Sequence, residues 1–246
     1  LYFILNGNYN KAIFRNSRVK YIEYIKDSLL SVVRGLGGSA QTAERDERAE
    51  LDITLPEDCV PYFRASIEEK IGEVIAVGYK NEYFEKYVRV SGLNNEEYSL
   101  LLSALIAADF QEDCAYAASK IVGDPYTIDG SFNFTLKPLL EKWAEVVACL
   151  PPVFRAGQLK DFISYLVSER KGRKVYVAKG GVYDECFTRL KRVNLCGDDE
   201  NLKIVREVIL SGAGAVELDF KPPEKDEFYL KEYFGEKIFF GKGYFD

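Results

Sequence analysis

Apolar residues recur at helical spacing in the middle of the chain, between Asp129 and Arg170. Their steps along the sequence place them on one stripe of a helix with 3.6 residues per turn. They are Leu136, Leu139, Leu140, Trp143, Val146, Val147 and Leu150 in a first stretch, and Leu159, Phe162, Ile163, Leu166 and Val167 in a second. Pro151 and Pro152 separate the two stretches, because proline interrupts a helix. We therefore expect two amphipathic helices that bury their stripes against each other and form the core.

The N-terminal part is predicted to be a strand, a helix and a second strand. An aromatic and β-branched run at residues 2–5 favours a strand, and an apolar period of three to four favours a helix at residues 17–35. Ser17 fits the N-cap of this helix, and a glycine cluster fits its end. The polar residues 39–49 are interpreted as a mobile loop. Alternation of apolar and polar residues then predicts a half-buried strand at residues 51–55.

The rest of the chain passes from helical to mixed patterns. Between residues 61 and 124 the spacing predicts three helices, the third of which begins after Asn94. Two short apolar runs separated by Lys179–Gly181 indicate a β-hairpin. The elements expected in the last part are hairpin strands at 174–178 and 182–187, helices at 200–210 and 226–234, and further strands at 215–220 and 237–240.

These elements predict an α+β fold. It would comprise a small N-terminal strand-helix-strand unit (residues 1–56), a helical middle (residues 57–170), and a C-terminal α/β unit with a β-hairpin (residues 171–246). The three parts could be separate units or one compact domain.

The composition is that of a folded, globular protein. Of 246 residues, 47% are hydrophobic and 29% are charged, unlike the polar, highly charged chains that stay disordered. A net charge of −6 argues against a surface that follows nucleic acid or anionic lipid over its whole extent. No apolar run approaches the roughly 20 residues that a membrane span requires. Five scattered cysteines without a C-x-x-C motif fit reduced thiols, so we expect a cytoplasmic protein.

The chain contains no histidine. This removes the most common general base, the Ser-His-Asp and Cys-His nucleophile systems, and the most common transition-metal ligand. Carboxylates are plentiful, and paired acids could hold a metal or perform glycosidase chemistry if they met in a pocket. A simpler interpretation places them on solvated loops and at a helix N-terminus, where Asp198 or Asp199 would serve as N-cap. We expect no cofactor and no metal.

Basic residues concentrate around the predicted hairpin. From Glu169 to Arg192 there are eight basic residues and three acidic ones, in a protein whose total charge is negative. Such a patch could meet an anion or an acidic partner. The candidate residues are Arg170, Lys171, Arg173, Lys174, Arg189, Lys191 and Arg192. The alternative is that they protect a hairpin edge from pairing with other chains.

One segment resembles a known family. The string Thr127–Lys137 (TIDGSFNFTLK), the helix that follows to Cys149, the segment Asp161–Val167 (DFISYLV) and the hairpin from Lys174 occur in this order. Together they resemble the YtxC-like sporulation proteins of spore-forming Firmicutes. The resemblance implies a sporulation-associated cytoplasmic protein. It carries over no catalytic residue, no cofactor and no site residue.

The functional hypothesis is a non-enzymatic protein that acts in sporulation through contacts with an unknown protein partner. The alternative is a module that binds phosphate or a nucleic-acid backbone through the basic 170–192 hairpin. A third reading is an enzyme that uses Asp and Glu with a metal. No membrane association is expected.

Overall fold

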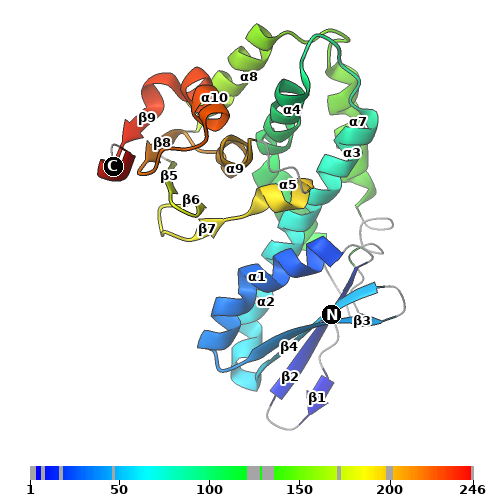
Figure 1. Ribbon diagram of the computed structural model, residues 1–246. Helices are drawn as coiled ribbons and strands as arrows, with labels where there is room; N and C mark the ends of the chain where they lie inside the picture. Colours follow the sequence, from blue (N-terminus) through cyan, green and yellow to red (C-terminus); the bar gives the residue numbers. More distant parts are fainter. Residues whose placement is uncertain are drawn as a thin grey trace. The chain divides into compact units, whose positions relative to one another are not determined.

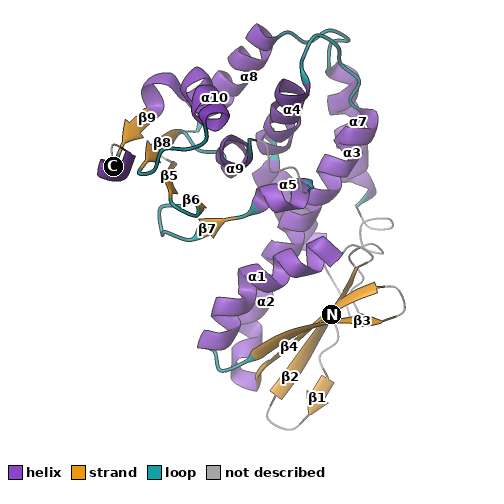
Figure 2. Ribbon diagram, viewed as in Figure 1, coloured by secondary structure: helices purple, strands orange, loops and turns teal. Residues whose placement is uncertain are grey.

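The computed structural model describes residues 4–6, 9–16, 19–45, 48–120, 128, 136–170, 173–197 and 202–244 (Figure 1). Over these residues the protein combines helices with two sheets, as the predicted α+β class requires (Figure 2). Its contacts divide it into two compact units, residues 1–80 with 111–145 and residues 81–110 with 146–246. Each unit thus combines two separate stretches of chain, whereas the sequence pattern pointed to three consecutive parts.

The first unit contains a four-stranded antiparallel sheet. Its strands are β1 (Ile4–Asn6), β2 (Tyr9–Asn16), β3 (Ser39–Arg45) and β4 (Arg48–Pro56), in the order β1-β2-β4-β3. Helix α1 (Val19–Gly35) contacts β2, β3 and β4 and buries Ile22, Ile25 and Leu29. Leu51, Ile53 and Leu55 of β4 are buried as well, which confirms the predicted strand. The helix ends where Gly37 adopts a φ of 75°, so the predicted helix end is also confirmed.

Two strands of this sheet differ from the sequence-based expectation. The prediction of a mobile loop at residues 39–49 is wrong for Ser39–Arg45, because these residues form the edge strand β3 and pair with β4. Strand β2 was not predicted at all. Neither sequence separates large apolar from polar residues at a period of two, and both strands are specified by their pairing with β4. The N-cap proposed at Ser17 lies outside the described residues.

The helices of the first unit include an unusual segment. Helix α2 (Val60–Glu73) continues without a break into a π-helical segment (Val74–Tyr79) and then into α3 (Lys80–Tyr87), which belongs to the second unit from Asn81 onward. A Cβ atom at Gly78 would lie 2.5 Å from the Tyr21 ring of α1, so only glycine permits this close approach. Helices α5 (Phe110–Lys120) and α7 (Lys137–Cys149) add further residues to this unit.

The second unit contains a mixed five-stranded sheet. The strands are β5 (Lys174–Ala178), β6 (Gly181–Tyr183), β7 (Arg189–Leu190), β8 (Ala215–Leu218) and β9 (Ile238–Phe240), in the order β7-β6-β5-β8-β9. Strands β5, β8 and β9 are parallel, and the predicted hairpin pairs β5 with β6. The helices are α4 (Asn95–Ala108), α8 (Ala156–Glu169), α9 (Lys203–Ser211) and α10 (Glu224–Phe234). Helix α4 is buried on all sides from Leu100 to Ala107 and contacts α8 and α9.

The predicted central pair of helices exists but is packed differently. Helices α7 and α8 confirm the two apolar periods, and Asn94 caps α4 in a capping box with Glu97. The expectation that the two stripes bury each other is wrong, because α8 packs on α4 and α10 while α7 lies largely in the first unit. The linker before α8 is fixed within the second unit: the Ser91 N–H donates to the Pro152 carbonyl, and the Phe154 N–H donates to the Ser91 carbonyl. These bonds hold the start of α8 beside the N-terminal end of α4.

Candidate functional site

The structure distributes the predicted basic patch over different environments. Arg170 donates to the carbonyl oxygens of Ala107 and Ala108 at the end of α4. Burial, together with the charge of Arg173, lowers the pKa of Arg170. The Arg192 guanidinium lies 4.3 Å from the centre of the Phe110 ring. These two cations are therefore parts of the packing.

The remaining predicted cations lie around the β5–β6 hairpin. Lys174 is 2.6 Å from a carboxylate oxygen of Glu217, and Arg173 is exposed. Arg189 and Lys191 line a pocket, described below. Lys171 lies outside the described residues.

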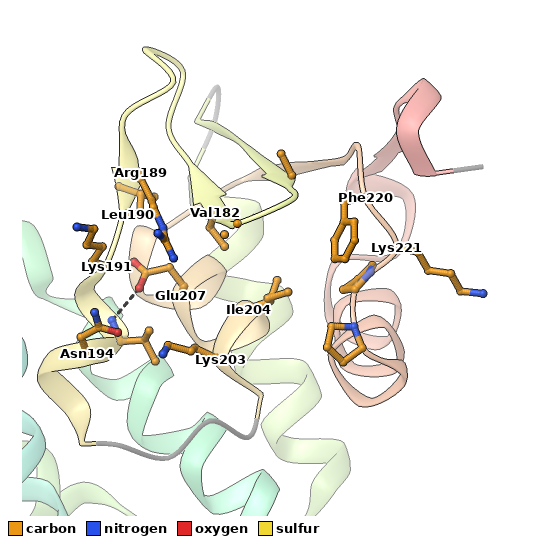
Figure 3. Close-up of a pocket in the computed structure, with 16 residues that line it drawn as sticks. Val182, Arg189, Leu190, Lys191, Asn194, Lys203, Ile204, Glu207, Phe220 and Lys221 are labelled. Carbon is orange, nitrogen blue, oxygen red and sulfur yellow. Dashed lines mark hydrogen bonds between the residues drawn. The ribbon is translucent and has the colours of Figure 1, made fainter. Parts of the chain in front are cut away.

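The pocket has a volume of about 670 Å³ and lies wholly within the second unit (Figure 3). It is bounded by the hairpin, by η3 (Arg192–Cys196), by the start of α9 and by the segment that follows β8. Half of its sixteen lining residues are apolar: Ala178, Val182, Leu190, Val193, Ile204, Phe220, Pro222 and Pro223. Pockets of this size and lining are typical of small-molecule sites.

A buried carboxylate forms part of the pocket wall. Glu207 of α9 is only 2% exposed, and the backbone N–H of Val193 donates to its Oε2 atom over 2.7 Å. Figure 3 shows the Arg189 side chain directed toward this carboxylate. A carboxylate has several acceptor positions, so Glu207 could also accept a hydrogen bond from a bound molecule.

Basic side chains outnumber this acid. Arg189, Lys191, Lys203 and Lys221 line the pocket, but the Lys191 and Lys221 side chains are directed away from its interior (Figure 3). The Gly180–Gly181 turn has positive φ angles, and a Cβ atom at Gly181 would lie 3.0 Å from the Arg189 Nε atom. Arg189 and Lys203 bring positive charge to the wall that contains Glu207, so this wall could hold an anionic group.

The N-terminus of α9 does not supply an anion site in this pocket. Its Val205 N–H donates to the buried Asp226 carboxylate over 2.8 Å. Burial raises the pKa of Asp226, although hydrogen bonds from the backbone of Val205 and Ile204 oppose that rise. An anion in the pocket would therefore be held by side chains. The N-caps proposed at Asp198 and Asp199 lie outside the described residues.

A second surface, which we call the aromatic face, comprises Tyr176, Phe187 and Phe239 with the ion pair of Lys174 and Glu217. The Phe187 and Tyr176 rings are stacked with their centres 5.0 Å apart. Lys174 lies 5.3 Å from the Tyr176 ring and 5.1 Å from the Phe239 ring. Phe187 is 70% exposed and Phe239 is 50% exposed. A row of aromatic side chains thus crosses β5 and β9 at the surface.

The loop that presents Phe187 is tightly hydrogen-bonded. Asp184 Oδ1 accepts from the N–H groups of Cys186 and Thr188 over 2.9 and 2.8 Å. Phe187 itself has a φ of 56°, which is rare for a bulky residue. Strained backbone conformations cluster at functional sites, so the exposed Phe187 ring is a candidate binding residue.

The first unit contains a buried ionic cluster that is better explained by structure. Fully buried Lys80 donates to Asp113 Oδ2 over 2.7 Å, and Trp143 Nε1 donates to the same atom over 2.9 Å. Lys142 donates to Asp113 Oδ1 over 2.9 Å. Burial alone would raise the pKa of Asp113, but the Lys80 charge and these hydrogen bonds outweigh it and lower the pKa. Both carboxylate oxygens of Asp113 thus accept hydrogen bonds, which is more typical of a structural residue than of a catalytic acid.

Two features are absent from the described part of the chain. Within it, no group of three or more His, Cys, Asp or Glu residues is placed to hold a metal ion. None of its helices combines the length and apolarity needed to cross a bilayer. All five cysteines are reduced, and Cys149 and Cys186 are exposed.

Comparisons of the chain with protein-family models, with curated proteins and with solved structures find no match. The resemblance to the YtxC-like family therefore stays a prediction.

Sequence reasoning identified Arg189 and Lys191 but missed the groups that complete the pocket. Glu207, Lys203 and Phe220 come from other elements, and their sequence context marks them only as helix or loop residues. For the aromatic face there was a usable signal: Lys174 and Tyr176 alternate with buried Val175 and Val177 along β5. That alternation indicates a strand with one face left open.

Proposed function

We propose that this protein acts by binding a partner protein and does not catalyse a reaction. In keeping with the family resemblance, we propose that it does so in the cytoplasm of sporulating cells. The observation that carries the proposal is the aromatic face, where Phe187 and Phe239 are exposed beside Tyr176. Exposed aromatic rings are enriched at the centres of protein interfaces, where they contribute much of the binding energy.

The electrostatics of this face favour a protein over a nucleic acid. Lys174 at its centre is neutralised by Glu217, so it offers little free charge to a phosphate. Exposed Arg173 and Lys179, at the two ends of β5, leave a basic rim. The expected partner therefore presents apolar side chains for the rings and acidic side chains for the rim.

The rigid loop around Phe187 also supports a binding role. Asp184 accepts hydrogen bonds from the backbone on both sides of Phe187, so the loop already has a fixed conformation before a partner binds. This reduces the conformational entropy that is lost on binding.

A crosslinking experiment followed by affinity measurements tests this proposal. A photoreactive phenylalanine analogue at position 187 should capture a defined protein in sporulating cells, and the same analogue at position 228 should not. Phe228 is a suitable control because it is 61% exposed but lies on α10. With the purified partner, Phe187→Ala and Phe239→Ala should each weaken binding about 10- to 30-fold, as for interface hot spots. Equal crosslinking at both positions, or equal affinity for Phe187→Ala and Phe228→Ala, would refute the role of this face.

The second candidate function is anion binding at the hairpin. The observation in its favour is that Arg189 and Lys203, from two different elements, line the same pocket. Support for an extended nucleic-acid track is weaker, because Arg170, Arg192 and Lys174 are engaged within the protein.

A further inference from the structure

The pocket beside the hairpin occupies a favourable place in the sheet. It lies where β5 ends at Ala178 and where the chain leaves β8 toward Phe220, so it is at the carboxyl ends of two adjacent parallel strands. Ligands of open α/β sheets bind at this edge, because the connecting segments there diverge and leave a crevice. Its position and its volume of about 670 Å³ are two independent reasons to expect a small molecule.

The two sides of the pocket differ in chemistry. Figure 3 shows Phe220 on the side opposite Arg189 and Lys191. Phe220, Pro222 and Ile204 offer an apolar surface against which a ring could pack. A ligand that spans the pocket would meet apolar groups at one end and cations at the other.

The charged side selects an anionic group. Arg189 can bind a phosphate or carboxylate through two parallel N–H donors, and Lys203 adds a point charge. Glu207 restricts the orientation, because an anionic group placed against it would be repelled while an N–H or O–H donor would be attracted. A ligand that suits this side of the pocket therefore carries both an anionic group and a polar, uncharged group.

We infer that this pocket binds a small organic anion of mononucleotide size, with a ring packed near Phe220 and a phosphate or carboxylate group held by Arg189 and Lys203. A long nucleic acid fits poorly, because the other predicted cations do not extend the site. This inference goes beyond partner binding and does not depend on the aromatic face.

The direct test is calorimetric titration of the full chain with matched probes. These are nucleoside monophosphates, the corresponding uncharged nucleosides, inorganic phosphate, a hexose phosphate, an aromatic carboxylate and a single-stranded oligonucleotide. At least one ring-bearing anion should bind at least 10-fold more tightly than its uncharged counterpart and than inorganic phosphate. Absence of binding by every organic anion would overturn the inference, and preferential binding of the oligonucleotide would replace it with a nucleic-acid site.

Variants locate the binding site. Arg189→Gln and Phe220→Ala should each weaken binding at least 10-fold, whereas Lys221→Gln should leave it unchanged because Lys221 is directed away. Should Arg189→Gln fail to fold, as judged by thermal unfolding, Lys203→Gln removes a charge from the same group. An equal loss in Lys221→Gln would contradict the assignment. Phe187→Ala should keep ligand affinity and Arg189→Gln should keep partner affinity, so failure of one proposal is distinguishable from failure of the other.

Discussion

The ion pair of Lys80 and Asp113 shows how much can depend on single residues. Moving two charges out of water costs several kcal/mol, and only close pairing with further hydrogen bonds offsets that cost. Asp113 meets this requirement through Lys80, Lys142 and Trp143. The pair therefore adds little net stability compared with an apolar core, but removal of one partner leaves a buried charge.

Substitution of Asp113 should show how strongly the free energy of unfolding depends on this ion pair, both at neutral pH and as the pH is changed. Asp113→Asn should destabilise the first unit by about 3–5 kcal/mol at neutral pH, because the buried Lys80 charge would lose its carboxylate partner. The pKa of Asp113 is lowered in the folded chain, so the stabilisation is present at neutral pH and is lost as the pH falls below about 4. In urea unfolding at several pH values, the free energy of unfolding should fall less at acidic pH for Asp113→Asn than for the wild type. Exposed Glu112→Gln is the control and should change stability by less than about 1 kcal/mol.

At the scale of elements, local signals explain which helices and strands were predictable. The Asn94 capping box, Gly37 and the Gly180–Gly181 turn each mark a boundary through their own backbone geometry. The π-helical segment at Val74–Tyr79 carries no such signal, because its sequence is equally suited to an α-helix. It exists where Tyr21 packs on Gly78, a contact between residues distant in the chain.

Gly78→Ala should therefore destabilise the protein, by about 1–3 kcal/mol or more as for overpacked core positions. The reason is that its Cβ would lie 2.5 Å from the Tyr21 ring, so α1 or the π-helical segment must shift. Gly35→Ala is a matched control, because no atom lies within 4 Å of a Cβ there. Thermal unfolding should separate the two variants. An unchanged melting temperature for Gly78→Ala would contradict the close packing of Tyr21 on Gly78.

At the scale of the whole molecule, the two units are interleaved along the chain. Residues 81–110 belong to the unit that contains the C-terminal sheet, and residues 111–145 return to the first unit. Helix α4, which is buried on all sides from Leu100 to Ala107, is the central helix of the second unit. A cut at residue 170 would remove α9, which packs against it.

Fragments 1–170 and 171–246 should therefore not be soluble, folded proteins when produced separately. The first would expose the apolar surface of α4, and such surfaces promote association. Size-exclusion chromatography and far-UV circular dichroism on each fragment, beside the full chain, test this expectation. A monomeric and cooperatively unfolding 171–246 fragment would instead support the consecutive division suggested by the sequence.

The sequence by itself determined the α+β class, most helices, the hairpin and the absence of histidine chemistry, because these follow from composition and from patterns within a few residues. Tertiary structure alone decided which side chains meet. Arg170 reaches carbonyl groups 62 and 63 residues away, and Lys80 pairs with an acid 33 residues away. Among the basic residues that form one patch in the sequence, Arg170 and Arg192 are packing residues, Lys174 forms a surface ion pair, and Arg189 and Lys191 line a pocket. Periodicity is a local property, whereas a binding site depends on contacts between distant segments, which the packing of the whole core fixes.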